Sequence, residues 1–126
     1  EAVVLTGADP NLEAPLFIDL NDLGIRSMEY SPGIGEYLII AGSHQGGDDE
    51  PVQYLYNYDF TVQDRDKLAT FSDDMTPEAI FQFPDANDIN LLSDDGTRII
   101  DTSTGTVINK EQLREQRIFR TRTIKP

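Results

Sequence analysis

Short apolar runs alternate with clusters of Gly, Pro, Asn and Asp along most of this 126-residue chain, and this spacing limits the folds it can adopt. These four residue types favour tight turns, whereas short runs rich in aromatic and β-branched residues favour strands. The first complete group of runs lies at residues 25–30, 37–41, 52–58 and 68–71. We therefore predict one four-stranded antiparallel meander over residues 24–72.

Two of these runs differ in their pattern. Residues 37–41 are apolar throughout, which is typical of a central strand covered on both faces. Residues 52–58 alternate instead, and the side chains expected on one face are those of Val52, Tyr54, Tyr56 and Tyr58. Strict alternation indicates a strand with one packed face, so we predict an outer strand. The three tyrosines could form a platform that stacks on carbohydrate, but we interpret them as core.

The pattern restarts after this meander. Residues 76–126 are predicted to form a second, altered unit that ends in a closing strand at 118–124. Its other predicted strands lie at 79–83, 89–92, 98–101 and 106–108. The Asp-Gly pair within 93–96 predicts a hairpin turn, and Asn109 could cap one short helix over 110–117. Runs at 2–6 and 16–20 are interpreted as the end of a preceding unit spanning residues 1–20.

Four-stranded units of this length in series are typical of β-propellers. A propeller needs about four blades to close its ring, and this chain holds about two to three. We therefore predict an all-β fold in which residues 1–126 form a single unit, a partial β-propeller with one short C-terminal helix. The alternative is that the strands close on themselves as a compact β-sandwich or barrel.

The charge of the chain is unevenly distributed. There are 23 acidic and 10 basic residues, giving a formal net charge of −13. Residues 1–109 hold four basic and 21 acidic residues, a net of −17, whereas residues 110–126 hold six basic and two acidic residues, a net of +4. An acidic body repels phosphate backbones, so no nucleic-acid partner is expected. We predict that Arg120 and Arg122 pair with carboxylates of the body rather than clamp an anion.

Several further features bound the chemistry and the location of the chain. It has no cysteine, which excludes disulfides and thiolate chemistry but does not fix a compartment. The longest apolar run, 37–41, is too short to span a bilayer, so no membrane partner is expected, and no signal-peptide pattern occurs within the chain. Because the first residue is Glu1 rather than methionine, we interpret the chain as processed, truncated or part of a longer one. The compartment is unknown.

Candidate site residues are few. His44 is the only histidine and could act as a base or ligand, but Ser43 beside it cannot complete a triad because adjacent strand residues point to opposite faces. No cofactor is expected, although calcium is possible, since clustered carboxylates suit it. The candidate calcium ligands are Asp48, Asp49 and Glu50, in a Gly-rich loop. The acidic clusters at 73–74, 85–88 and 94–95 are interpreted as turns. No spacing selects a catalytic pair of carboxylates.

Four sequence blocks carry a resemblance to a known family. They are Gly-Ile-Arg-Ser-Met-Glu-Tyr-Ser-Pro at 24–32, Glu-Tyr-Leu-Ile-Ile-Ala-Gly at 36–42, Gln-Tyr-Leu-Tyr at 53–56, and the closing block from 91–96 through 119–124. In this order they resemble the C-terminal part of an uncharacterised bacterial family, a domain of unknown function with β-propeller-like repeats. More remotely, the chain is similar to phytase-like and esterase-like propellers, whose openings can hold calcium. No catalytic residue of those propellers is matched here.

Two functional hypotheses follow. The first is a non-catalytic propeller-type binding or scaffold module, whose partner is the remainder of a longer propeller chain or a homo-oligomer formed through exposed sheet edges. The alternative is a fragment of a calcium-dependent phytase-like or esterase-like hydrolase. For this chain alone we favour a role other than that of an enzyme.

Overall fold

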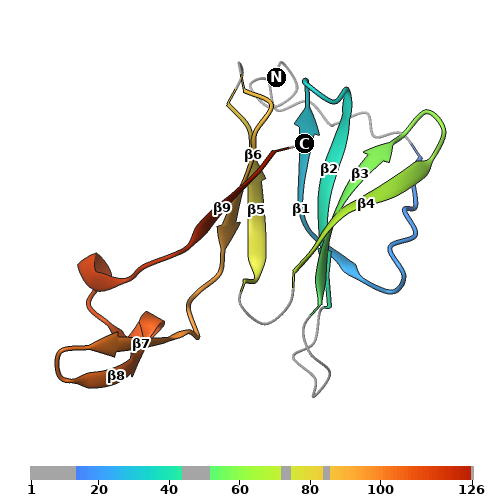
Figure 1. Ribbon diagram of the computed structural model, residues 1–126. Helices are drawn as coiled ribbons and strands as arrows, with labels where there is room; N and C mark the ends of the chain where they lie inside the picture. The colour runs from blue at the N-terminus through green and yellow to red at the C-terminus, as the bar shows by residue number, and fades with distance from the viewer. Residues whose placement is uncertain (1–13, 44–51, 72–74, 84–85, 126) are drawn as a thin grey trace, which may run out of the picture.

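The computed structural model describes residues 14–43, 52–71, 75–83 and 86–125, and these form antiparallel β-structure (Figure 1). The strands of the first sheet are β1 (Gly24–Ser31), β2 (Glu36–Gly42), β3 (Gln53–Asp59) and β4 (Asp64–Phe71). The later strands are β5 (Pro77–Phe81), β6 (Ile89–Ser93), β7 (Ile99–Thr102), β8 (Gly105–Ile108) and β9 (Thr121–Ile124). Two short 3-10 turns, η1 (Asn109–Glu111) and η2 (Arg114–Gln116), lie between β8 and β9.

The first sheet has the order β1-β2-β3-β4, which confirms the predicted meander over 24–72. Register shifts interrupt the β1–β2 pairing between Ile25 and Ser27 and the β3–β4 pairing between Leu55 and Tyr56. The fourth strand begins at Asp64, earlier than the apolar run at 68–71 indicated. Its first half is charged because β4 is an edge strand, where charged side chains discourage pairing with other sheets.

The prediction for residues 37–41 is confirmed. Leu38 and Ile40 contribute to one hydrophobic cluster, and Ile39 and Ala41 contribute to a second cluster on the opposite face. All four side chains are fully buried. Strand β2 is thus the central element on which both halves of the core are built.

The prediction that residues 52–58 form an outer strand is wrong. Strand β3 pairs with both β2 and β4, so it lies inside the sheet. Tyr56 and Tyr58 are buried on one face as expected, but Leu55 on the other face is fully buried as well. Gln53 and Asn57 share this second face with Leu55, and their polar character made the face look exposed in the sequence. Gln53 is itself buried.

A second sheet, ordered β5-β6-β9, packs on one face of the first. The residues of the shared core are Leu38, Ile40, Leu55, Phe71, Met75, Ile80, Ile89 and Leu91. Strand β5 lies beside the β1 edge, where the Ile80 amide donates to Ser27 Oγ at 3.1 Å and Arg26 lies 3.6 Å from Glu78. The described residues thus form a two-layer antiparallel arrangement and no closed barrel.

The opposite face of the first sheet is covered by irregular chain. Ile18, Leu20 and Leu23 pack there against the cluster that contains Ile39 and Tyr56. The predicted strand at 16–20 is wrong: residues 14–20 have no regular structure. Asn21 and Asp22, at φ 55° and 62°, turn the chain in the left-handed region that these two residue types tolerate best. The predicted strand at 2–6 lies outside the described residues.

The second unit differs from a four-stranded meander. Strands β7 and β8 pair only with each other among the described strands, and β9 pairs directly with β6. The predicted β-hairpin at 93–96 is therefore wrong, because the strands on either side of it do not pair. We call residues 96–119 the arm, since Figure 1 shows β7, β8 and the 3-10 turns standing away from the two packed sheets.

The predicted helix over 110–117 is also wrong, because the arm holds η1 and η2 in its place. Residue Gln112 between them is extended, with φ −70° and ψ 162°. Asn109 does not cap this segment from outside: it is the first residue of η1 and is buried. Across the part of the chain described, no helix has the length and apolar character needed to cross a bilayer.

Candidate functional site

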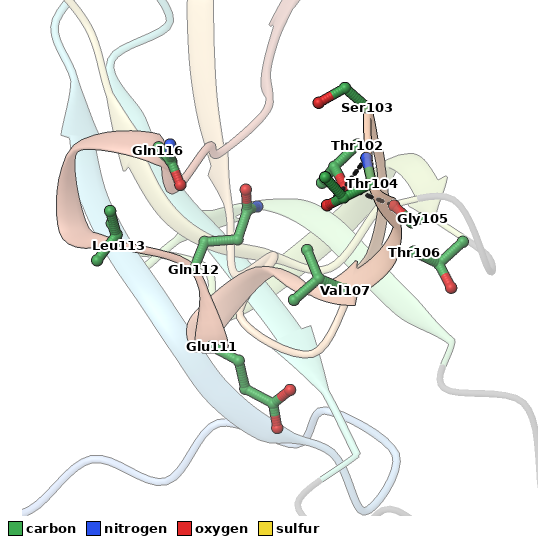
Figure 2. Close-up of a pocket in the computed structure, with 10 residues that line it drawn as sticks. All are labelled: Thr102, Ser103, Thr104, Gly105, Thr106, Val107, Glu111, Gln112, Leu113 and Gln116. Atoms are coloured by element: carbon green, nitrogen blue, oxygen red, sulfur yellow. Dashed lines mark hydrogen bonds between the residues drawn. The ribbon is translucent and has the colours of Figure 1, made fainter.

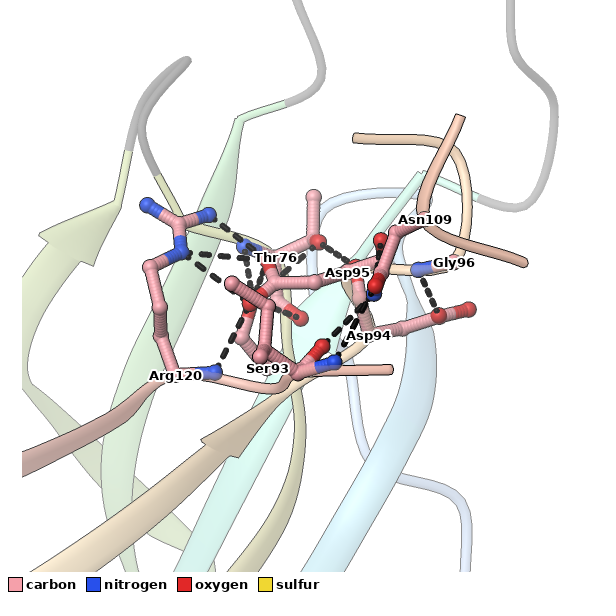
Figure 3. A network of polar contacts seen from close by, with 8 residues as sticks. Thr76, Ser93, Asp94, Asp95, Gly96, Asn109 and Arg120 are labelled. Atoms are coloured by element: carbon pink, nitrogen blue, oxygen red, sulfur yellow. Dashed lines mark hydrogen bonds and ion pairs between the residues drawn. The ribbon is translucent and has the colours of Figure 1, made fainter. Parts of the chain in front are cut away.

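A buried carboxylate holds the base of the arm (Figure 3). The Asp95 residue is 3% exposed. Its side chain accepts hydrogen bonds from the Arg120 amide at 2.7 Å, from Arg120 Nη2 at 2.7 Å, and from Ser93 Oγ at 3.1 Å. Arg120 Nε lies 3.1 Å from both carboxylate oxygens. The prediction that Arg120 pairs with a carboxylate of the body is thus confirmed.

Asn109 completes this polar hub. It is 3% exposed, and its Nδ2 donates to the carbonyl oxygens of Asp95 at 2.9 Å and Ile118 at 2.6 Å. Its Oδ1 accepts from the Ile118 amide at 3.0 Å. The hub of Ser93, Asp95, Asn109 and Arg120 therefore joins the outgoing and returning segments of the arm to the end of β6.

The electrostatics of the hub suit a structural role. The hydrogen bonds that Arg120 donates hold the pKa of Asp95 below its usual range, and they outweigh the effect of burial, which raises it. A general acid or base near neutral pH needs a pKa close to the working pH and access to substrate. The Asp95 carboxylate has neither property, so its position indicates a structural anchor.

Arg122 lies differently from Arg120. Its guanidinium carbon is 5.9 Å from the centroid of the Phe71 ring, which is a cation–π arrangement. This contact links β9 to β4 across the shared core. The predicted pairing of Arg122 with a carboxylate is not among the contacts that the structure gives.

The arm encloses an open cleft of about 800 Å³ between its hairpin turn and the 3-10 turns (Figure 2). One wall is formed by residues 102–107 of the hairpin, and the other is formed by residues 111–113 and Gln116. Among the ten lining residues Glu111 is the only ionisable group, and none is histidine. The cleft can hold a bound group, but its lining offers no nucleophile with an adjacent base.

A second surface lies on the first sheet. Ile25, Met28 and Tyr30 of the edge strand β1 are 50%, 46% and 48% exposed. They are paired in register with Ala41, Ile39 and Tyr37, so they share the face that the irregular N-terminal segment covers. We call these three side chains the apolar stripe. Ile18, Leu20 and Leu23 of the described N-terminal segment pack on the neighbouring cluster, which does not include the stripe.

The three tyrosines of β3, Tyr54, Tyr56 and Tyr58, are mostly core, as interpreted from the sequence. Tyr56 and Tyr58 are each 5% exposed. Lys67 Nζ lies 4.8 Å from the centroid of the Tyr54 ring, and the Arg65 guanidinium lies 5.6 Å from that of Tyr56. Burial raises the pKa of the Tyr56 hydroxyl. Tyr56 and Tyr58 are thus buried, and the half-buried Tyr54 ring has the Lys67 ammonium beside it, so the three rings do not form an open platform.

The predicted calcium ligands Asp48, Asp49 and Glu50, and also His44, lie outside the described residues. Within the described ranges, no three His, Cys, Asp or Glu side chains converge as a metal site would require. Of the two acidic residues at 94–95, Asp94 makes the expected turn by accepting from the Gly96 amide at 2.9 Å. Its neighbour Asp95 is the hub instead. Asp95 was interpreted as a turn residue, so its buried ion pair with Arg120, which lies 25 residues later in the chain, was missed.

Comparison with known proteins gives no further guide, because no family model, no curated protein and no solved structure matches this chain.

Proposed function

We propose that this chain is a non-catalytic binding or scaffold module of the β-propeller type, which associates by packing another β-sheet on the apolar stripe. The observation that carries this proposal is the unequal covering of the first sheet. One face lies against the β5-β6-β9 sheet through a continuous hydrophobic core. Among the residues that the structure describes, the other face carries its own buried cluster and is covered by irregular chain rather than by a sheet.

Adjacent propeller blades pack face to face, with apolar side chains on both faces of each inner blade. The residues 38–41 of β2 have this character, since they alternate between two clusters. A further sheet on the second face would bury Ile25, Met28 and Tyr30. Burial of apolar surface contributes about 25 cal/mol per Å², so covering these three half-exposed side chains would lower the free energy of association.

The non-catalytic part of the proposal rests on the chemistry of the described residues. Their most strongly bound carboxylate, Asp95, is held by Arg120 and Ser93. The cleft of the arm has one ionisable lining residue, Glu111. Neither place brings an acid and a base together at a surface that a substrate can reach.

Sedimentation velocity of the 126-residue chain tests this proposal. We expect reversible self-association that persists in about 0.5 M NaCl, because salt does not screen apolar burial. Met28→Lys together with Tyr30→Lys should remove it. Leu68→Lys is the matched control, since Leu68 is 41% exposed on β4 at the opposite edge of the same sheet. A chain that is monomeric at every concentration and salt would refute the proposal.

A further inference from the structure

The charges at the start of strand β4 are separated between its two faces. Residues 64–67 read Asp-Arg-Asp-Lys, so they alternate in sign. Because successive side chains of a strand point to opposite faces of the sheet, the two cations share one face and the two carboxylates share the other. Arg65 is paired in register with Tyr58, and Lys67 with Tyr56. The cations therefore lie on the face that carries the tyrosines of β3.

Cations are scarce in this part of the chain. Residues 1–109 hold four basic residues against 21 acidic ones, and two of the four are Arg65 and Lys67. Within the described part of the chain, the two ion pairs involve Arg26 and Arg120, so neither cation of β4 is paired with a carboxylate. Half of the positive charge of an acidic body is thus gathered on one strand face without a neutralising partner among these residues.

The aromatic rings of β3 hold these two cations in place. Lys67 Nζ lies 4.8 Å from the centroid of the Tyr54 ring, and the Arg65 guanidinium carbon lies 5.6 Å from that of the Tyr56 ring. The face of a ring attracts a cation electrostatically but carries no net charge that would cancel it. The Lys67 side chain is exposed, so its charge stays available to an anion from solution.

A pocket of about 300 Å³ lies beside the Lys67 side chain. Two aliphatic side chains contribute to its lining, and the polar residues that line it are Asn21, Ser43, Tyr54, Tyr56 and Lys67. None of these lining residues is acidic. The cleft at Arg65 differs, because Asp19 and Asp64 line it as well. An anion is therefore favoured on the Lys67 side, where no carboxylate belongs to the lining.

The polar side chains of this pocket are mainly hydrogen-bond donors. Arg65 Nη2 donates to Asn21 Oδ1 at 3.1 Å, so the accepting oxygen of Asn21 is occupied and its NH₂ group has no partner among the described residues. The Lys67 ammonium can only donate. Burial raises the pKa of the Tyr56 hydroxyl, so this group keeps its proton and can donate as well. A charged donor beside neutral ones complements a group with several anionic oxygens.

We propose that this pocket binds the oxyanion group of a small molecule, a carboxylate or a phosphate, with the Lys67 ammonium as its counter-ion and the Asn21 amide and tyrosine hydroxyls as further donors. A volume of about 300 Å³ is at the lower end of the range for small-molecule pockets, so the bound molecule is compact. Arg65 positions the Asn21 side chain. The site does not rest on the apolar stripe, which belongs to β1 at the opposite edge of the sheet.

Titration of the ¹⁵N-labelled chain with inorganic phosphate or with acetate, at an ionic strength kept constant with NaCl, tests the site in unaltered protein. We expect amide shifts confined to residues 21–23, 52–56 and 65–68 that saturate with a Kd on the order of 1 mM, as suits ligands this small. The anion that binds more tightly identifies the oxyanion class of the natural ligand. Shifts that do not saturate with either anion, or that spread over the whole surface, would overturn the proposal.

Substitutions in the pocket supply the second measurement. Lys67→Gln should raise the Kd of the tighter-binding anion by about tenfold or more, because it removes a charge-assisted hydrogen bond. Tyr54→Phe keeps the ring beside Lys67 but removes one donor, so it should raise the Kd by about threefold. Lys125→Gln is the matched control: Lys125 is exposed just after β9, and the same loss of charge there should leave the Kd within about twofold. Equal weakening by the two lysine substitutions would show a response to net charge alone and would rule out the pocket.

Discussion

Replacing Asp95 by asparagine tests whether the hub anchors the arm. The change keeps the shape of the side chain but replaces one accepting oxygen with an NH₂ group. That group would face either the Arg120 amide, now 2.7 Å from Oδ2, or the Arg120 guanidinium, now 2.7 Å from Oδ1. One donor of Arg120 therefore loses its acceptor, and the ion pair is lost as well.

The magnitude follows from the burial of the two partners. Breaking a fully buried pair by removing one charge costs about 3–5 kcal/mol. Here the Asp95 side chain is 1% exposed but that of Arg120 is 34% exposed, so water can rehydrate part of the freed guanidinium. The stability lost then approaches that of one hydrogen bond to a charged group, so the free energy of unfolding should fall by about 2–3 kcal/mol. For a chain of this size that corresponds to a fall in Tm of about 10 °C.

Urea unfolding followed by circular dichroism measures this change. The midpoint should fall while the m-value stays constant, because the surface exposed on unfolding is unchanged. Asp94→Asn is the matched control, since Asp94 is exposed and an asparagine side chain there can still accept from the Gly96 amide. The free energy of unfolding of this variant should lie within about 0.5 kcal/mol of that of the original chain. Equal stability of the two variants would refute the assignment of Asp95 as the anchor.

The difference in stability between the original chain and Asp95→Asn should also depend on pH. The pKa of Asp95 is lowered in the folded chain, mainly by the hydrogen bonds from Arg120. Its contribution to stability is therefore complete above the unfolded pKa, about 3.9, and is lost as the pH falls through the lower folded value. The stability difference between the original chain and Asp95→Asn should be constant from about pH 7 to 5 and shrink below about pH 4.

Three further outcomes are expected. Ile40→Ala should lower the free energy of unfolding by about 2–5 kcal/mol, because it opens a cavity in the core shared by the two sheets, whereas Val62→Ala at an exposed turn should change it by less than about 0.5 kcal/mol in the same urea titration. Asn109→Ala should release the returning half of the arm, so amide hydrogen exchange over residues 98–118 should quicken while exchange in β2 stays slow. For the non-catalytic module we expect calcium to leave Tm unchanged; a calcium-dependent hydrolase would instead show a rise of several degrees that Asp48→Asn with Asp49→Asn removes.

The sequence predicted the first sheet well because local and long-range signals agree there. The turn residues at 31–35 separate two runs that pair with each other, and the continuous apolar run at 37–41 needs cover on both faces. A strand with these properties can only lie inside a sheet. The two-layer packing follows from the same requirement, since the residues on each face of β2 need a separate covering layer.

The wrong predictions concern polar residues that are buried through contacts with distant parts of the chain. Asp95 and Gly96 carry the pattern of a hairpin turn, but Arg120 draws the carboxylate inward and β9 takes the place beside β6 that a hairpin strand would occupy. Asn109 carries the pattern of a helix cap, but its amide bridges Asp95 and Ile118 instead. Local patterns specify turns and caps; they do not specify a partner 25 residues away.

The direct pairing of β6 with β9 places the two ends of the arm next to each other. The Ser93 amide donates to the Arg120 carbonyl at 3.0 Å, so the chain leaves the second sheet and returns to it at one point. An excursion with adjoining ends behaves as an insertion: changing its length alters the closure entropy only slowly. Residues 97–118 can therefore be exchanged for a loop of another length or specificity while the β5-β6-β9 sheet keeps its strands, provided that the new loop leaves Asp95 bound to Arg120.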